Sequence, residues 1–146
     1  MFARQQAIAD PGKPAIIMAS SGDTVTFGEY EARGNRVANL LREAGLRRGD
    51  HIAVLMENSP ELLEIEAGAE RAGLYYSLIN TYLSAEEVAY VVANSQAKVL
   101  FSSAAKRVAA EAAGAKCPGL DRMLMTGPGP LPARLFETLS LVSHVR

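Results

Sequence analysis

Apolar residues along the chain follow two alternating spacings. Stretches with apolar residues three and four positions apart are typical of helices, and they cover 26–44, 60–72, a stretch that begins at 84, and about 103–113. Short apolar runs with little alternation are typical of strands covered on both faces, and they lie at 51–56, 74–79, 98–101 and 121–125. This order predicts an α/β fold with a mostly parallel sheet and flanking helices.

Polar residues mark where the predicted helices begin and end. Thr26 with Glu29, and Ser84 with Glu87, have the spacing of a capping box, in which a hydroxyl and a carboxylate each satisfy a free backbone N–H. Ser59 precedes a proline and is expected to cap the helix at 60–72. Glycine adopts the left-handed conformation that ends helices, and the predicted stops are Gly45 and Gly73.

The sequence pattern of the N-terminal segment predicts one small β-hairpin. The first dozen residues are polar, end in the chain breakers of 10–14, and predict no regular element. Two short extended runs, Ala15–Ala19 and Thr24–Phe27, are joined by four turn residues, Ser20–Asp23, which predicts the hairpin.

The composition changes at the C-terminal end, which divides the chain into two parts. Residues 1–125 are predicted to form the α/β portion, whereas 126–146 are predicted to be a Gly/Pro-rich connector and a truncated tail with a weak helical pattern. The stretch Gly127–Pro132 lies after a predicted strand and superficially resembles a phosphate-binding loop. Its three prolines lack the N–H groups that hold phosphate, so a stiff connector is the favoured interpretation.

Composition narrows the class of protein. The 146 residues contain 15 Lys and Arg against 16 Asp and Glu, so no positive field favours nucleic acid. With 49% hydrophobic residues the chain suits a globular domain, and its single cysteine cannot form an internal disulfide. We find no signal peptide and no apolar run of about 18 residues, and we therefore expect a cytoplasmic protein without a transmembrane segment.

Candidate chemical groups are few and scattered. His51 is expected at a partly exposed strand end, and His144 lies in the tail with no candidate partner. Cys117 precedes a proline in a loop without a nearby histidine, so it is not expected to be a nucleophile. Two histidines and one cysteine at such positions predict no metal site.

Two further groups of residues favour structural roles. Five glutamates are expected to form the solvated face of a helix rather than an acid–base or metal site, namely Glu57, Glu61, Glu64, Glu66 and Glu70. Four tyrosines are expected to pack in the core or at an interface rather than line an apolar pocket, namely Tyr75, Tyr76, Tyr82 and Tyr90. The sequence thus predicts no catalytic, cofactor-binding or metal-binding residue.

The ordered motifs of the chain resemble the N-terminal region of ATP-dependent acyl-CoA ligases, the fatty-acid branch of the acyl-adenylate-forming enzymes. The resemblance covers Ala15 to Phe101 and continues faintly to Met125. It is carried by Thr26-Phe27, Gly45-Leu46-Arg47-Arg48-Gly49-Asp50, Asn58-Ser59-Pro60-Glu61, Ala72-Gly73, Ile79-Asn80, Ser84-Ala85-Glu86-Glu87 and Asn94-Ser95-Gln96-Ala97-Lys98-Val99-Leu100. Leu78 departs from the pattern, since family members commonly have proline there.

The resemblance implies a parent enzyme that converts a carboxylic acid, most often a fatty acid, with ATP and CoA into acyl-CoA through an acyl-adenylate, using Mg²⁺. The family's ATP-binding loop, its later nucleotide motifs, its magnesium-holding glutamate and its C-terminal lysine have no counterpart in these residues. We therefore expect an incomplete part of the large adenylation domain, from a shortened chain or a disrupted reading frame, that binds no cofactor and is inactive alone.

The expected partner is the remainder of the ligase chain, and uncovered surfaces could also drive self-association. The resemblance leaves peripheral membrane association of the parent open. The alternative is a freestanding α/β binding or oligomerisation module without catalysis.

Overall fold

A four-stranded parallel sheet forms the centre of the molecule. The computed structural model describes residues 2–126. The strands are β3 (His51–Leu55), β4 (Tyr75–Leu78), β5 (Ala97–Ser103) and β6 (Arg122–Thr126), in the order β4-β3-β5-β6. Every neighbouring pair is parallel, which confirms the predicted α/β class.

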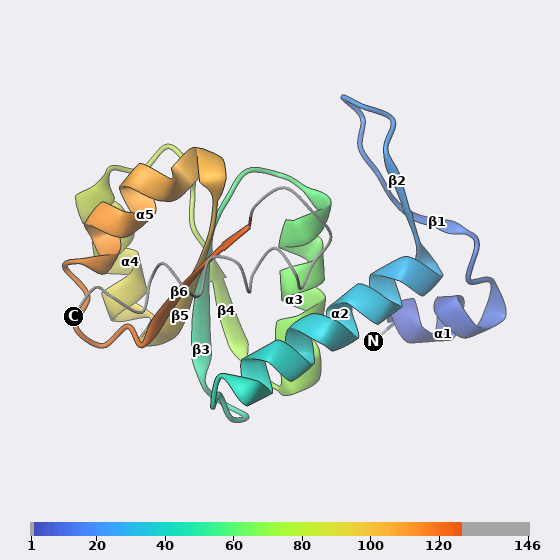
Figure 1. Ribbon diagram of the computed structural model, residues 1–146, viewed down its shortest axis with the longest axis horizontal. Coiled ribbons are helices and arrows are strands. Elements are labelled where there is room, and N and C mark those ends of the chain that lie inside the picture. The colour runs from blue at the N-terminus through green and yellow to red at the C-terminus, as the bar shows by residue number, and fades with distance from the viewer. Residues whose placement is uncertain (1, 127–146) are drawn as a thin grey trace.

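Helices cover both faces of this sheet (Figure 1). On one face lie α2 (Phe27–Glu43) and α3 (Pro60–Ala72), and their core includes Leu41, Ile65 and Phe101. On the other face lie α4 (Ala85–Asn94) and α5 (Arg107–Gly114), and that core contains Val88, Leu100 and Ala113. The two central strands, β3 and β5, are almost fully buried because helices cover both of their faces.

The predicted N-caps Thr26, Ser59 and Ser84 are confirmed, whereas the helix predicted to begin at about residue 103 begins at Arg107. The backbone N–H of Thr26 donates to Glu29 Oε2 at 2.9 Å, and that of Ser84 donates to Glu87 Oε2 at 2.8 Å. These backbone hydrogen bonds stabilise the ionised carboxylates and hold the pKa of Glu29 and of Glu87 below the ordinary value. Gly73 ends α3 with a φ of 73°, the left-handed conformation expected of a C-terminal glycine.

The N-terminal region contains one element that the sequence pattern missed. The predicted hairpin is present as β1 (Pro14–Ile17) and β2 (Thr24–Thr26), which pair antiparallel. The helix α1 (Phe2–Ala9) was not predicted, because its Ala, Arg and Gln residues favour a helix without forming an apolar stripe. Figure 1 shows α1 and the hairpin beside the N-terminal end of α2, away from the sheet.

The last two strands differ slightly from their predicted bounds. Strand β5 runs two residues past the predicted 98–101, to Ser103, and the next helix begins with a short 3-10 turn, η1 (Ala104–Lys106). Strand β6 ends at Thr126, one residue past the predicted 121–125. The predicted connector and tail at 127–146, with His144 and Gly127–Pro132, lie outside the described residues.

Candidate functional site

The strand order creates one point where the connections leave the sheet in opposite directions. From β3 the chain passes to α3 on one face, whereas from β5 it passes through η1 to α5 on the other. These two strands are neighbours in the sheet. Open α/β sheets bind ligands outside the carboxyl ends of their strands at such a switch point. The carboxyl edge between β3 and β5 is therefore the candidate site.

A hydrogen bond joins the two strands at this point. Ser103, the last residue of β5, donates its Oγ hydrogen to Glu57 Oε2 at 2.6 Å. Ser103 is only 6% exposed, whereas Glu57, two residues past the end of β3, is exposed. The Ser103 hydroxyl thereby fixes the Glu57 carboxylate above the switch point, where it can accept further hydrogen bonds from a ligand or a neighbouring polypeptide.

A lysine holds the next two loops of the same edge together. Lys106 Nζ, in η1, donates to the Thr81 carbonyl oxygen at 3.1 Å and lies 6.0 Å from the centre of the Tyr82 ring. Both contacts join the start of the β5–α5 connection to the loop between β4 and α4. The carboxyl edge thus presents one carboxylate and one ammonium group on separate, fixed supports.

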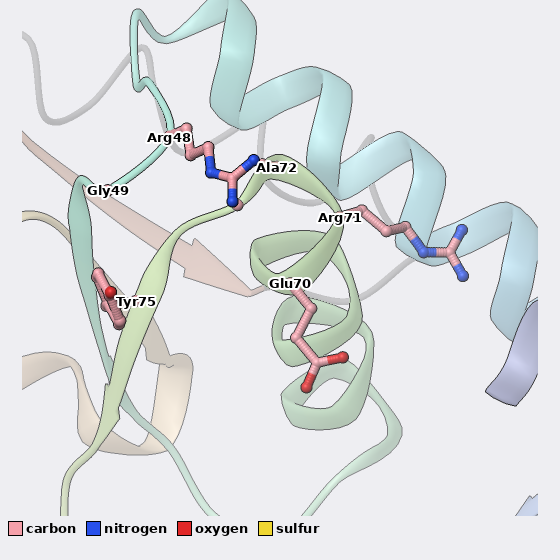
Figure 2. Close-up of a pocket in the computed structure, with 7 residues that line it drawn as sticks. Arg48, Gly49, Glu70, Arg71, Ala72 and Tyr75 are labelled. Carbon is pink, nitrogen blue, oxygen red and sulfur yellow. The ribbon is translucent and has the colours of Figure 1, made fainter. Parts of the chain in front are cut away.

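A cavity of about 450 Å³ lies at the opposite, amino edge of the sheet, around the end of α3. Figure 2 shows that its side chains diverge: Arg71 points toward α2, and Glu70 points in another direction along α3. Arg71 is ion-paired with Glu31, and Glu70 accepts from the Tyr76 hydroxyl at 3.3 Å. Arg71 and Glu70 are thus engaged and do not converge on a common point, and Arg48 is the third charged residue that lines the cavity. We therefore do not take this cavity as the candidate site.

The histidine and cysteine that sequence analysis considered have structural environments. His51 is partly buried at the start of β3, as predicted; its Nδ1 contacts the Ser95 carbonyl and its ring packs edge-on against Tyr75 at 5.0 Å. Cys117 is buried, and its Sγ contacts the Ala89 carbonyl at 3.4 Å. Burial raises the pKa of the Cys117 thiol, which disfavours the reactive thiolate.

The prediction of a solvated glutamate face was wrong for Glu64. This residue is 1% exposed, and Arg33 donates to its Oε1 at 2.9 Å. The helix α3 is covered by α2 as well as by the sheet, so its buried surface is wider than the apolar stripe indicated. Burial also raises the pKa of Glu66, which lies on the same helix.

The tyrosines divide into one that is packed and three that are not. Tyr76 packs against the core between the sheet and the layer of α2 and α3, as expected. Tyr75, Tyr82 and Tyr90 are mostly exposed, so they do not pack in the core, and their packing at an interface stays a prediction. Tyr75 lies on the edge strand β4, where no further strand covers it among the described residues.

Sequence reasoning missed the Glu57–Ser103 pair, although a signal for it was present. Glu57 directly follows the apolar run at 51–56, and Ser103 lies two residues past the run at 98–101. The carboxyl ends of parallel strands meet at one edge. Within residues 2–126, no group of three or more His, Cys, Asp or Glu side chains could hold a metal ion. In the same range, no helix is long and apolar enough to cross a membrane.

The doubly wound sheet and its switch point define an open α/β fold of the kind that binds nucleotides at the carboxyl edge. A family model described as AMP-binding enzyme matches residues 3–139. The chain belongs to this family, whose enzymes use ATP and CoA. The predicted resemblance to adenylate-forming acyl-CoA ligases is therefore confirmed.

Relatives and solved structures agree with this assignment. The chain is 38% identical over 97 residues to the mouse long-chain fatty acid transport protein 1, covering 65% of this chain and 15% of the relative. It is 36% identical over 99 residues to a 3-hydroxybenzoate–CoA ligase of Aromatoleum sp., covering 68% of this chain and 18% of the ligase.

A crystal structure of the N-terminal domain of FACL13 from Mycobacterium tuberculosis superposes with a TM-score of 0.82 at 28% identity. The superposition covers 96% of this chain and 34% of that chain. The chain therefore spans less than a fifth of the length of the two sequence relatives, and about a third of the solved domain.

Proposed function

We propose that this chain forms the N-terminal layer of the adenylating domain of an acyl-CoA ligase. The parent reaction joins a carboxylic acid, fatty acids being the first class to test, to CoA through an acyl-adenylate formed from ATP. The observation that carries the proposal is the parallel sheet with its switch point, together with the likeness to the FACL13 domain over 96% of the chain.

The geometry of the switch point favours a structural role for the described residues over a catalytic one. Adenylation requires cationic and backbone donors around the phosphates of ATP. Glu57 and Ser103 offer a carboxylate and a hydroxyl that are already bonded to each other, and the Lys106 ammonium is held by a carbonyl oxygen. We therefore propose that the groups acting on ATP belong to other parts of a ligase.

The groups at the switch point can also be compared with those that would be needed to hold the Mg²⁺ of the family reaction. Magnesium is usually held by carboxylates and substrate phosphates with near-octahedral geometry. Glu57 is the carboxylate that the switch point offers, and Ser103 occupies one of its oxygens. These residues do not fit a magnesium site, and we place no Mg²⁺ on the described part of the chain.

The first experiment measures pyrophosphate release by the purified chain with ATP, Mg²⁺ and CoA and with a panel of fatty acids and hydroxybenzoates. We expect no release above the level without enzyme. The second replaces the matching part of the FACL13 N-terminal region with residues 1–126 of this chain inside the full-length ligase. We expect that chimera to retain adenylation. Turnover by the chain alone, or a folded chimera without turnover, would contradict the proposal.

A second candidate function is self-association without catalysis. The edge strand β4 exposes Tyr75 and Leu78, at 66% and 49%, along a row of backbone groups that no described strand pairs with. Light scattering after size exclusion separates the two functions. A stable dimer that dissociates on Tyr75→Lys favours the association module, whereas a monomer that supports an active chimera favours the ligase layer.

A further inference from the structure

Two carboxyl groups of α3 meet one hydroxyl group of the edge strand β4. Glu66 and Glu70 are four residues apart, so their side chains lie one turn apart on the same side of the helix. The Tyr76 hydroxyl donates to Glu70 Oε1 at 3.3 Å and also forms a hydrogen bond with the Glu66 carboxyl group. The Tyr76 ring packs against the core that α2 and α3 cover. We call these three residues the Tyr76 triad.

The number of hydrogens in the triad decides how many of these contacts can be satisfied. A phenol carries one hydrogen to donate, and an ionised carboxylate carries none. With both glutamates ionised, Tyr76 can donate to only one of them. One added proton completes the set: Glu66 then donates to Tyr76 Oη, and Tyr76 donates to Glu70. The protonated triad thus forms an unbroken chain of hydrogen bonds between α3 and β4.

Burial determines which carboxyl group takes up the proton. Glu66 is partly buried, whereas Glu70 is exposed. Burial raises the pKa of Glu66; the hydrogen bond with Tyr76 opposes this shift without cancelling it, and the negative charge of Glu70 adds to it. Burial and the two carboxylates also raise the pKa of Tyr76, which therefore keeps its hydrogen.

Other titratable and charged groups surround the triad within the part of the chain that the structure describes. On α2, Tyr30 lies within electrostatic reach of both glutamates, and its hydroxyl donates to the Leu63 carbonyl oxygen at 3.1 Å. Further groups of this kind nearby are Arg71 and Glu64 on α3, Tyr75 on β4, His51 on β3, and Arg48 in the turn before β3. Arg71 and Glu64 are both ion-paired with side chains of α2, so their charges are already compensated.

We propose that the Tyr76 triad is an acid-sensitive contact that holds the edge strand β4 against α3. Uptake of one proton at Glu66 strengthens the contact, and loss of that proton weakens it. The contact supplements the pairing of β4 with β3, since no described strand pairs with the other side of β4. Its stabilisation is complete below the pKa of the unfolded chain and is lost as the pH rises through the higher pKa of the folded state. This inference goes beyond the proposed function and does not depend on it.

The test measures amide hydrogen exchange at both edges of the sheet, at pH 5.0 and at pH 7.5. The backbone N–H of Ile79 donates to the Val54 carbonyl oxygen at 2.9 Å, so its exchange reports opening of β4. The backbone N–H of Asp121 donates to the Lys98 carbonyl oxygen at 2.8 Å, beside β6, and serves as the reference. After correction for intrinsic exchange rates, protection of Ile79 should be about two- to tenfold higher at pH 5.0. Protection of Asp121 should not change.

Three variants identify the groups responsible. Glu66→Gln keeps the side-chain volume and carries its own hydrogens, so protection of Ile79 should be equal at the two pH values. Tyr76→Phe keeps the ring and removes the bridging oxygen, so the pH dependence at Ile79 should disappear although Glu66 still titrates. Glu43→Gln is the matched control, because Glu43 is an exposed carboxylate at the end of α2, and it should leave the pH dependence unchanged.

The measurements can overturn the proposal in three ways. The first is equal protection of Ile79 at the two pH values in the unmodified protein. The second is a pH dependence that persists in Glu66→Gln, because another group, such as His51, would then be responsible. The third is an equal change at Asp121, since acid would then stabilise the whole sheet rather than β4.

Discussion

On one face of the sheet, α2 and α3 approach each other closely and are joined by an ion pair. On the other face, α4 and α5 meet through small apolar residues. Gly68 lies so near α2 that an added Cβ would come within 2.4 Å of Val37 Cγ1. Arg33 and Glu64 form an ion pair at 2.9 Å across the same interface. The opposite face is closed by Ala89, Ala110, Ala113 and Cys117.

The two interfaces differ in how strictly they fix the position of their helices. Close approach and a buried charge pair permit few alternative arrangements of α2 on α3, because a shift would separate the charges or create a clash. The alanines and the thiol between α4 and α5 pack without a charge pair that would fix one arrangement. We therefore expect the α2–α3 face to tolerate substitutions less well than the α4–α5 face. Two comparisons test this difference, and a third, on the helix caps, is a control in which both faces should lose the same stability.

The first comparison substitutes one glycine on each face. Gly68→Ala places its Cβ against the Val37 side chain and 3.0 Å from the Ala38 backbone nitrogen, so α2 must move. We expect a loss of about 2–3 kcal/mol in the free energy of unfolding, measured with urea. Gly114→Ala meets Met123 Cε at 2.4 Å, but that methyl is the end of a flexible side chain. We expect a loss of less than about 1 kcal/mol there.

A double substitution checks the cause. Val37→Ala would leave the Val37 Cβ at 2.5 Å from the added Cβ, whereas Val37→Gly removes both this carbon and Cγ1 at 2.4 Å. The losses from Gly68→Ala and Val37→Gly should therefore sum to more than the loss in the double variant. If Gly68→Ala and Gly114→Ala cost the same, the proposed contrast between the faces is wrong.

The second comparison neutralises one acid of each ion pair. Glu64→Gln leaves the volume unchanged but removes the charge that Arg33 faces, and side-chain exposure of 1% at Glu64 limits rescue by water. We expect a loss of about 2 kcal/mol by thermal unfolding. Glu86→Gln removes the partner of Lys116, where the two side chains are 82% and 52% exposed. That change should stay within about 0.5 kcal/mol.

The third comparison concerns the capping boxes, one in each layer. Thr26→Ala should cost about 1 kcal/mol, and Ser84→Ala a similar amount, because a cap acts locally whichever face its helix covers. Backbone hydrogen bonds lower the pKa of Glu29 and of Glu87. Their stabilisation is therefore complete above the pKa of the unfolded chain and is lost as the pH falls through the lower pKa of the folded state.

Urea unfolding at pH 7 and pH 3 measures this effect. The Ala variants should lose less stability than the unmodified chain on acidification, since they lack part of the stabilisation that acid removes. A larger acid sensitivity in either variant would show that the capping carboxylates do not stabilise the folded state.

Much of the fold could be predicted from local patterns. The capping boxes, the stop at Gly73 and the apolar runs gave the order of helices and strands, because each depends on residues close in sequence. Helix α1 was missed because it lacks an apolar stripe and packs on α2. Burial of Glu64 was missed because the helical period describes a single covered face, whereas α3 touches both the sheet and α2.

The candidate site could be predicted only in part. The sequence shows that Glu57 and Ser103 each lie just past an apolar run, but their contact requires β3 and β5 to be neighbours. β3 and β5 are neighbours because the chain crosses from β4 over β3 to β5. The same alternation of helix and strand is compatible with several other strand orders, so the sequence pattern does not specify this one. The environment of Tyr82 likewise depends on Lys106, twenty-four residues further along the chain.

The amino-acid sequence by itself determined the class of fold, the starts and stops of most helices, and membership of a ligase family, because these follow from short-range spacing and ordered motifs. The tertiary structure alone decided which strands are neighbours, which charges are buried, and which carboxyl-edge groups meet. The physical reason is that pairing of parallel strands and packing of helices join residues distant in sequence, and the free energy of those contacts depends on the whole arrangement.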